Sequence, residues 1–274
     1  GFKDHVNITL QALALSDLCC SLTMFWSAIA ETVYVIRPPP FFFEPFSLLV
    51  MTGSFPRLIF TRVTSWLTAL IALERCVCVA LPFKVRVIFS PRNSSLITFS
   101  VFSVVFTSHM FIYYSRSFQM VYNPRFNMSQ VVMATVQERV KDSFYISTTL
   151  FICLPLVNYF FILSCTLMML WRLKISTTWR TSAQAGSDDV IARKVNVSKE
   201  KRLTKMIATT TSVFIACSTP INVALAVTLF VPGFQSTGDN SLAYTTMHMF
   251  GNLMETINSS VGLFVYYHQS SKFK

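Results

Sequence analysis

An adjacent acid and base, Glu74 and Arg75, end the apolar stretch that runs from Leu58 to Leu73. Such a pair can cap a helix in a soluble protein, or it can make contacts that differ between two states of a membrane protein. Other ionisable side chains lie inside apolar stretches: Asp17, Arg57, Arg62 and Glu255. A charge in lipid is costly unless it is paired, hydrated or bound to a ligand. These residues are therefore the first candidates for function.

The composition favours a membrane protein. Hydrophobic residues make up 53% of the 274 residues and charged residues only 13%, whereas a soluble domain carries about 25% charge. The net charge of +11 lies in segments between the apolar stretches and not on one amphipathic face, which argues against nucleic-acid binding. No nucleophile, base and orienting group recur together, and seven Gly form no phosphate loop, so the sequence indicates no enzyme and no cofactor. The seven Cys lack zinc-ligand spacing and are interpreted as buried thiols.

Six stretches approach the roughly 20 apolar residues that a membrane-spanning helix needs. They cover residues 7–31, 47–73, 94–115, 144–171, 206–231 and 241–267. Sixteen of the 23 Lys and Arg lie on one side of the resulting arrangement, which the positive-inside rule assigns to the cytoplasm. The sequence predicts an all-α membrane protein in a single domain over residues 1–274, with both ends in the cytoplasm.

The spacing from Glu74 and Arg75 to Pro82 resembles the end of the third helix in rhodopsin-like (class A) G-protein-coupled receptors, although Cys76 replaces the usual Tyr. Other motifs of that family recur in order along the chain. They include Asn7 and Asp17 of the second helix, Pro155 of the fifth, Phe214, Cys217 and Pro220 of the sixth, and Asn258, Ser259 and Tyr266 of the seventh, with Phe273 in the short helix that follows.

The resemblance implies a seven-helix bundle at the plasma membrane, of which this chain would hold the second to seventh helices and the start of the cytoplasmic amphipathic helix. The first helix would be missing, and Gly1–Val6 would be the rest of the first intracellular loop. Some family motifs diverge: at the outer end of the third helix Val50 stands where a disulfide cysteine is usual, and in the sixth helix Ser218 replaces a Trp. This pattern favours an invertebrate-type chemosensory or neuropeptide receptor.

The same resemblance assigns roles at the cytoplasmic face. Arg75 would be the switch residue, Glu200 its partner at rest, and Phe83, next to Pro82, the side chain that docks on a heterotrimeric G protein. Phe214, Cys217 and Pro220 would form the hinge of the sixth helix. A transporter or channel, and a non-signalling protein with this fold, remain alternatives. A transporter would favour internal repeats with broken helices, and the sequence contains no such repeat.

Two polar sites are expected within the bundle. Asp17, Thr64, Asn258 and Ser259 would share a polar core that holds Na⁺ in the family, but Gly262 replaces one of its usual Asn ligands. Ordinary hydrogen bonding between helices would explain the same residues.

Arg57 defines the second polar site. It precedes Arg75 by 18 residues, or five helical turns, and therefore faces the expected ligand cavity. It would bind a small anionic or peptide ligand, or pair with Glu255; Arg62, rotated away from Arg57, would be structural. On the outer face, Asn127-Met128-Ser129 is a potential glycosylation site.

Overall fold

The computed structural model describes residues 5–36, 42–80, 88–124, 127–136, 140–181, 190–235 and 238–269. The described chain is mainly helical. In chain order, its helices are α1 (His5–Ile36), α2 (Pro45–Leu49), α3 (Phe55–Ala80), α5 (Pro91–Tyr114), α6 (Val140–Thr148), α7 (Leu154–Thr181), α8 (Val190–Phe230) and α9 (Ser241–Gln269), with π-helical turns η1 (Val50–Ser54) and η3 (Thr149–Cys153). Each of the six apolar stretches falls on one of these helices or on helices joined by a π turn.

Four of the helical segments are long and apolar enough to cross a membrane: Asn7–Thr32, Pro91–Tyr114, Phe144–Trp171 and Lys205–Phe230. Large apolar side chains on their surfaces, including Phe25, Phe99 and Phe160, are more than half exposed, as expected for helices in lipid. The other two predicted spans, which contain Arg57 and Glu255, are helical but less apolar. The count of seven transmembrane helices remains a prediction.

Both π turns lie next to a proline. η1 ends two residues before Pro56, and η3 ends two residues before Pro155. Proline lacks an N–H donor, and its ring clashes with the carbonyl group four residues earlier, which is Thr52 or Phe151 here. One widened turn relieves this clash, so α2–η1–α3 and α6–η3–α7 each continue through their proline as one long helical segment.

Helix α3 is the centre of the bundle and packs against α1, α5, α7 and α8. Its buried side chains Ile59, Val63, Leu67 and Ile71 recur at helical spacing and form the main apolar cluster with Leu13 of α1 and residues of α5 and α8. Because α3 is packed between these helices, the polar side chains on α3 are held at defined positions inside the bundle.

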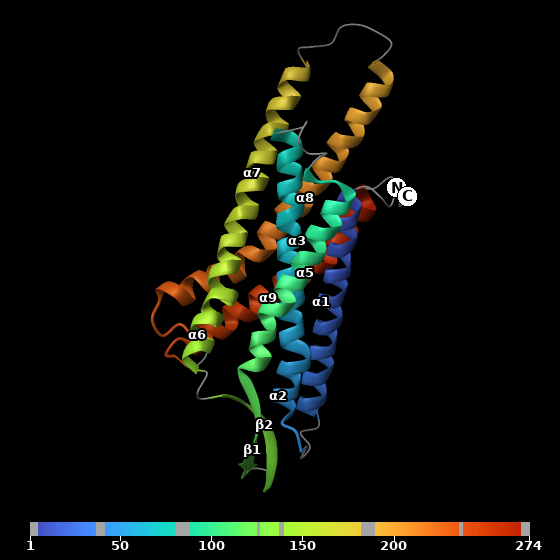
Figure 1. The fold of residues 1–274 in the computed structure, drawn as a ribbon. Coiled ribbons are helices and arrows are strands. Elements are labelled where there is room, and N and C mark those ends of the chain that lie inside the picture. Colours follow the sequence, from blue (N-terminus) through green and yellow to red (C-terminus); the bar gives the residue numbers. More distant parts are fainter. Residues whose placement is uncertain are drawn as a thin grey trace.

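A β-hairpin covers one end of the bundle, whereas the sequence predicted an all-α protein. Strands β1 (Arg116–Asn123) and β2 (Met128–Thr135) pair antiparallel from Arg116↔Thr135 to Asn123↔Met128. The segment before α2 joins them through a bridge from Phe43 to Val131. At the opposite end, where α1 begins, α7 and α8 extend beyond the other helices (Figure 1).

Candidate functional site

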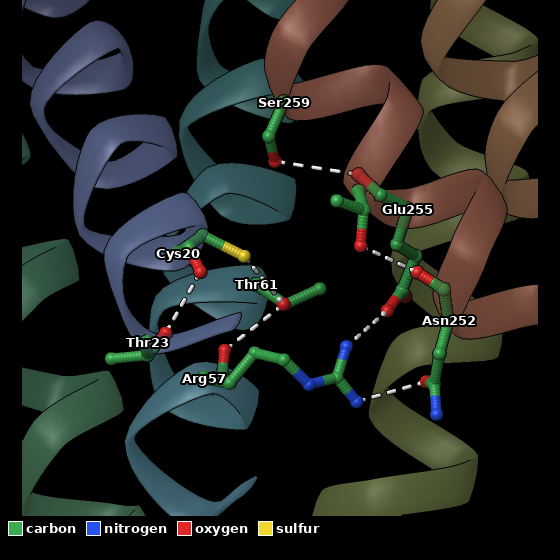
Figure 2. Close-up of polar contacts among 8 residues, drawn as sticks. Cys20, Thr23, Arg57, Thr61, Asn252, Glu255 and Ser259 are labelled. Carbon is green, nitrogen blue, oxygen red and sulfur yellow. Dashed lines mark hydrogen bonds and ion pairs between the residues drawn. The ribbon is translucent and has the colours of Figure 1, made fainter. Parts of the chain in front are cut away.

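Arg57 of α3 and Glu255 of α9 form an ion pair inside the bundle. Arg57 Nη1 lies 3.6 Å from Glu255 Oε2, and only 12% of either side chain is exposed. Arg57 Nη2 also donates a hydrogen bond of 2.9 Å to Asn252 Oδ1 (Figure 2). Asn252 and Glu255 lie three residues apart on one face of α9, so a single guanidinium group binds both and joins two helices that are far apart in sequence.

Hydrogen bonds connect this pair to α1. Thr61 Oγ1 donates to the Arg57 carbonyl oxygen at 3.0 Å and lies 3.4 Å from Cys20 Sγ (Figure 2). These contacts fix the backbone of α3 around Arg57 against α1, while the guanidinium group reaches α9. The polar contacts of Arg57 therefore involve three helices.

Arg62 was expected to be structural and to point away from Arg57. Five residues turn a helix by about 140°, yet Arg62 also interacts electrostatically with both Glu255 and Arg57. Its side chain is buried, and its Nε atom has no hydrogen-bond partner within the described part of the chain. Glu255 thus interacts electrostatically with both arginines, and the ion pair that the structure shows for it is with Arg57.

Arg62 and Glu255 line a narrow cavity between α3, α7, α8 and α9. Most of its lining residues have polar side chains, among them Thr64, Tyr159, Ser218, Asn222, Asn258 and Ser259. The cavity has space for about one water molecule. It accommodates one small polar group and not a whole organic ligand.

A second small cavity lies beside Asp17, and its lining includes Thr64 and Asn258. Thr64 Oγ1 lies 2.9 Å from Asp17 Oδ1. Ser259 Oγ donates a hydrogen bond of 3.3 Å to the Glu255 carbonyl oxygen and also interacts with the Asp17 carboxylate. Asp17, Thr64, Asn258 and Ser259, which the sequence grouped together, are therefore brought together. At Gly262, a Cβ atom would lie 3.7 Å from Asp17 Oδ2, so the missing Asn side chain would have started directly beside the carboxylate.

The proposed hinge lies in α8 and borders both cavities. Phe214 lines both, Cys217 is buried, and Pro220 lies inside the helix. Ser218, which stands where the family has a Trp, donates a hydrogen bond of 2.6 Å to the Phe214 carbonyl oxygen. The small Ser218 side chain leaves the cavity beside Arg62 open.

At the other end of α3, Glu74 and Arg75 are both buried. Arg75 Nη2 lies 3.3 Å from Glu74 Oε1, and their side chains are 7% and 1% exposed, respectively. The structure describes the helical backbone at Glu200 and Tyr266 but not their side chains, and Pro82 and Phe83 lie outside the described residues. The resting partner and the G-protein contact that were predicted from the sequence therefore stay predictions.

The family profile described as 7 transmembrane receptor (rhodopsin family) matches residues 2–266. The chain belongs to this family. Among curated proteins, a search finds no match. As a rhodopsin-family receptor, the chain is a multi-pass membrane protein of a signalling family and not of an enzyme family.

In this rhodopsin-family receptor, Asn127 lies at the tip of the β-hairpin. It is exposed, has a backbone φ of 50°, and accepts a hydrogen bond from the Tyr122 hydroxyl group. A positive φ is tolerated by Asn more readily than by most residues. The position is accessible to a modifying enzyme.

The sequence did not reveal Asn252 or Ser16 as members of the receptor's polar network. Asn252 binds Arg57, and Ser16 Oγ lies 2.9 Å from Thr64 Oγ1 while donating to the Phe60 carbonyl oxygen. The three-residue spacing of Asn252 from Glu255 was an available signal for the first. No signal in the sequence pointed to Ser16, because serine is common in transmembrane helices.

Proposed function

We propose that the chain is a plasma-membrane receptor that binds an extracellular ligand and activates a heterotrimeric G protein. The family match supports signalling by a receptor. The long α7 and α8 project at one end (Figure 1). The sequence from Arg172 to Lys205, which includes that end of both helices, holds nine of the 23 Lys and Arg, and this basic charge favours a cytoplasmic partner.

The ligand carries a carboxylate or another anionic group that binds Arg57. The observation that carries this proposal is the ion pair of 3.6 Å between Arg57 and Glu255. The Glu255 carboxylate pairs with the Arg57 guanidinium group in the way that a ligand carboxylate would. Two arginines and one glutamate interact here, which leaves an excess positive charge that attracts an anion and repels a cationic amine.

Arg62 makes the exchange of carboxylates feasible. When a ligand carboxylate replaces Glu255 at Arg57, Glu255 still has the charge of Arg62 beside it. Without Arg62, displacement would leave a buried carboxylate unpaired, which costs several kcal/mol. The exchange removes the direct α3–α9 ion pair, and this loss is the step that couples ligand binding to helix packing.

A panel of organic acids and peptides, with a cationic amine set beside it, tests this ligand class by G-protein activation in cells. An activating acid should lose most of its potency in Arg57→Gln, and its uncharged amide analogue should lose little further in that variant. Glu255→Gln, which removes the internal competitor, should raise the potency of the acid.

Glu31→Gln is the matched control for Glu255→Gln, because it removes the same charge from an exposed position on α1. Full potency in Arg57→Gln, or activation by a simple cationic amine, contradicts the proposal. A small organic acid as the active compound would favour a chemosensory role, and a peptide acting through a carboxylate would favour a neuropeptide receptor.

The Asp17 cavity is the proposed position of Na⁺, if the receptor retains this family property. Oxygen atoms of Asp17, Thr64, Asn258 and Ser259 would surround the ion, and the cavity size suits about one water-sized species. Oxygen ligands suit a hard cation. Gly262 supplies no side-chain oxygen, which weakens the site relative to one with an Asn there.

A further inference from the structure

Arg62 is a buried cation without a direct partner. It lies in the middle of α3, and only 9% of its surface is exposed. Its Nε atom is buried with no hydrogen-bond partner, and among the described residues the structure shows no hydrogen bond or ion pair of its guanidinium group. Arginine keeps its positive charge in proteins, and a buried charge is costly unless it is paired and hydrogen-bonded. Arg62 therefore requires an acceptor that the surrounding side chains do not supply.

The charges around Arg62 determine what kind of acceptor fits. The nearby acid, Glu255, is held 3.6 Å from Arg57 in an ion pair. Arg57, Arg62 and Glu255 together carry two positive charges and one negative charge, so one positive charge is left over inside the bundle. A water molecule would accept a hydrogen bond from Arg62 Nε but would not offset this charge. A monovalent anion satisfies both requirements, and its attraction to the excess charge is strong where water is excluded.

The cavity beside Arg62 limits the size of this anion. The same cavity between α3, α7, α8 and α9 is lined by Arg62, Ser65, Asn222 and Glu255 among others, and it has space for about one water molecule. A chloride ion is only slightly larger than a water molecule, whereas phosphate, sulfate and organic carboxylates are much larger. We infer that this cavity binds one chloride ion beside Arg62. The chloride site does not depend on the proposed receptor function.

A second donor places the ion on the α3 side of the cavity. Ser65 Oγ accepts a hydrogen bond of 2.6 Å from Asn158 Nδ2, and its own O–H group has no acceptor within the described part of the chain. Ser65 follows Arg62 by three residues on one face of α3, so both can donate to one ion. The other lining groups include two acceptors, the Glu255 carboxylate and Asn222 Oδ1, which has no partner among the described residues. An anion avoids both and therefore lies close to α3.

The test compares thermal unfolding of the receptor in lipid nanodiscs in sodium chloride and in equimolar sodium gluconate, whose anion is too large for the cavity. With a dissociation constant of about 30 mM, chloride at about 150 mM should raise the melting temperature by about 2–4 °C. This shift should be lost in Arg62→Gln and retained in the matched control Arg92→Gln, which removes the same charge from an exposed position on α5. Equal melting in the two salts would mean that water alone fills the cavity and overturns the proposal, as does an undiminished shift in Arg62→Gln.

Asn222→Asp tests the site even if Arg62→Gln misfolds, because it keeps the side-chain size and puts a carboxylate on the cavity lining. This internal anion should take the place of chloride, so the variant should melt at the same temperature in chloride and in gluconate, whatever its absolute stability. A full chloride shift in Asn222→Asp refutes the site. These measurements use no receptor ligand, so a negative result leaves the proposed ligand contact at Arg57 standing, and failure of that contact leaves the chloride site standing.

Discussion

Replacing Glu255 with Gln should destabilise the receptor more than replacing Arg57 with Gln, although the two residues form one ion pair. The asymmetry arises because Glu255 interacts with two arginines, Arg57 and Arg62, whereas among the described residues Glu255 is the one acid shown to interact with either arginine. Loss of Glu255 leaves two buried positive charges together. Loss of Arg57 leaves Glu255 beside Arg62.

The magnitude follows from the geometry. Two unit charges 3.6 Å apart attract by about 4–5 kcal/mol at an effective dielectric constant of 20. Removing one partner of a buried pair costs about 3–5 kcal/mol. We assign this full cost to Glu255→Gln, and about half of it to Arg57→Gln because Glu255 keeps a cation nearby. For a chain of this length, the larger loss lowers the melting temperature by on the order of 10 °C.

Thermal unfolding of the receptor in lipid nanodiscs measures the difference, with Glu31→Gln as the exposed-charge control. The double variant Arg57→Gln/Glu255→Gln should be less destabilised than the sum of the single variants, because only Arg62 then remains charged. Equal melting temperatures for Glu255→Gln and Arg57→Gln, or an equal loss in Glu31→Gln, would refute the two-arginine arrangement.

Four further outcomes are expected. Glu200→Ala should raise basal G-protein signalling at equal surface expression, whereas Arg75→Ala should abolish coupling. Unchanged basal signalling in Glu200→Ala would contradict the predicted contact of Glu200 with Arg75 at rest. Treatment with a glycosidase should shift the gel mobility of the unaltered receptor but not that of Asn127→Gln. A shift that persists in Asn127→Gln would show that the glycan is attached at another residue. Sodium chloride should raise the melting temperature relative to potassium chloride in the unaltered receptor but not in Asp17→Asn; equal melting in the two salts excludes Na⁺. Ser218→Trp should be poorly tolerated, because an indole would fill the cavity beside Arg62, and normal stability of this variant contradicts that packing.

The sequence predicted the helices well because long apolar runs leave few alternatives in a membrane. It missed the β-hairpin, since neither strand has alternating polarity: Phe118, Met120, Val121 and Tyr122 of β1 are all exposed. Pairing with β2 and the contact of Phe43 with Val131 stabilise the hairpin, and both depend on tertiary structure.

The polar site was predicted in part. Helical periodicity correctly suggested that Arg57 could reach Glu255, and the structure contains this pair. For Arg62, periodicity gave its direction on α3 but not that it would line the same cavity as Glu255 and interact with it electrostatically.

Ser218, which replaces the family's Trp, lies beside the charged residues at the bundle centre. Arg62 is a bulky buried cation, and Ser218 is a small residue on the lining of the same cavity. A Trp at position 218 would occupy space and bring no acceptor for the guanidinium group. Glu255 supplies the negative charge that Arg62 requires, and its position on α9 also brings it to Arg57. The small Ser218 on α8 therefore leaves room in the cavity that Arg62 and Glu255 line, and the ion pair of Arg57 with Glu255 joins α3 to α9 beside it.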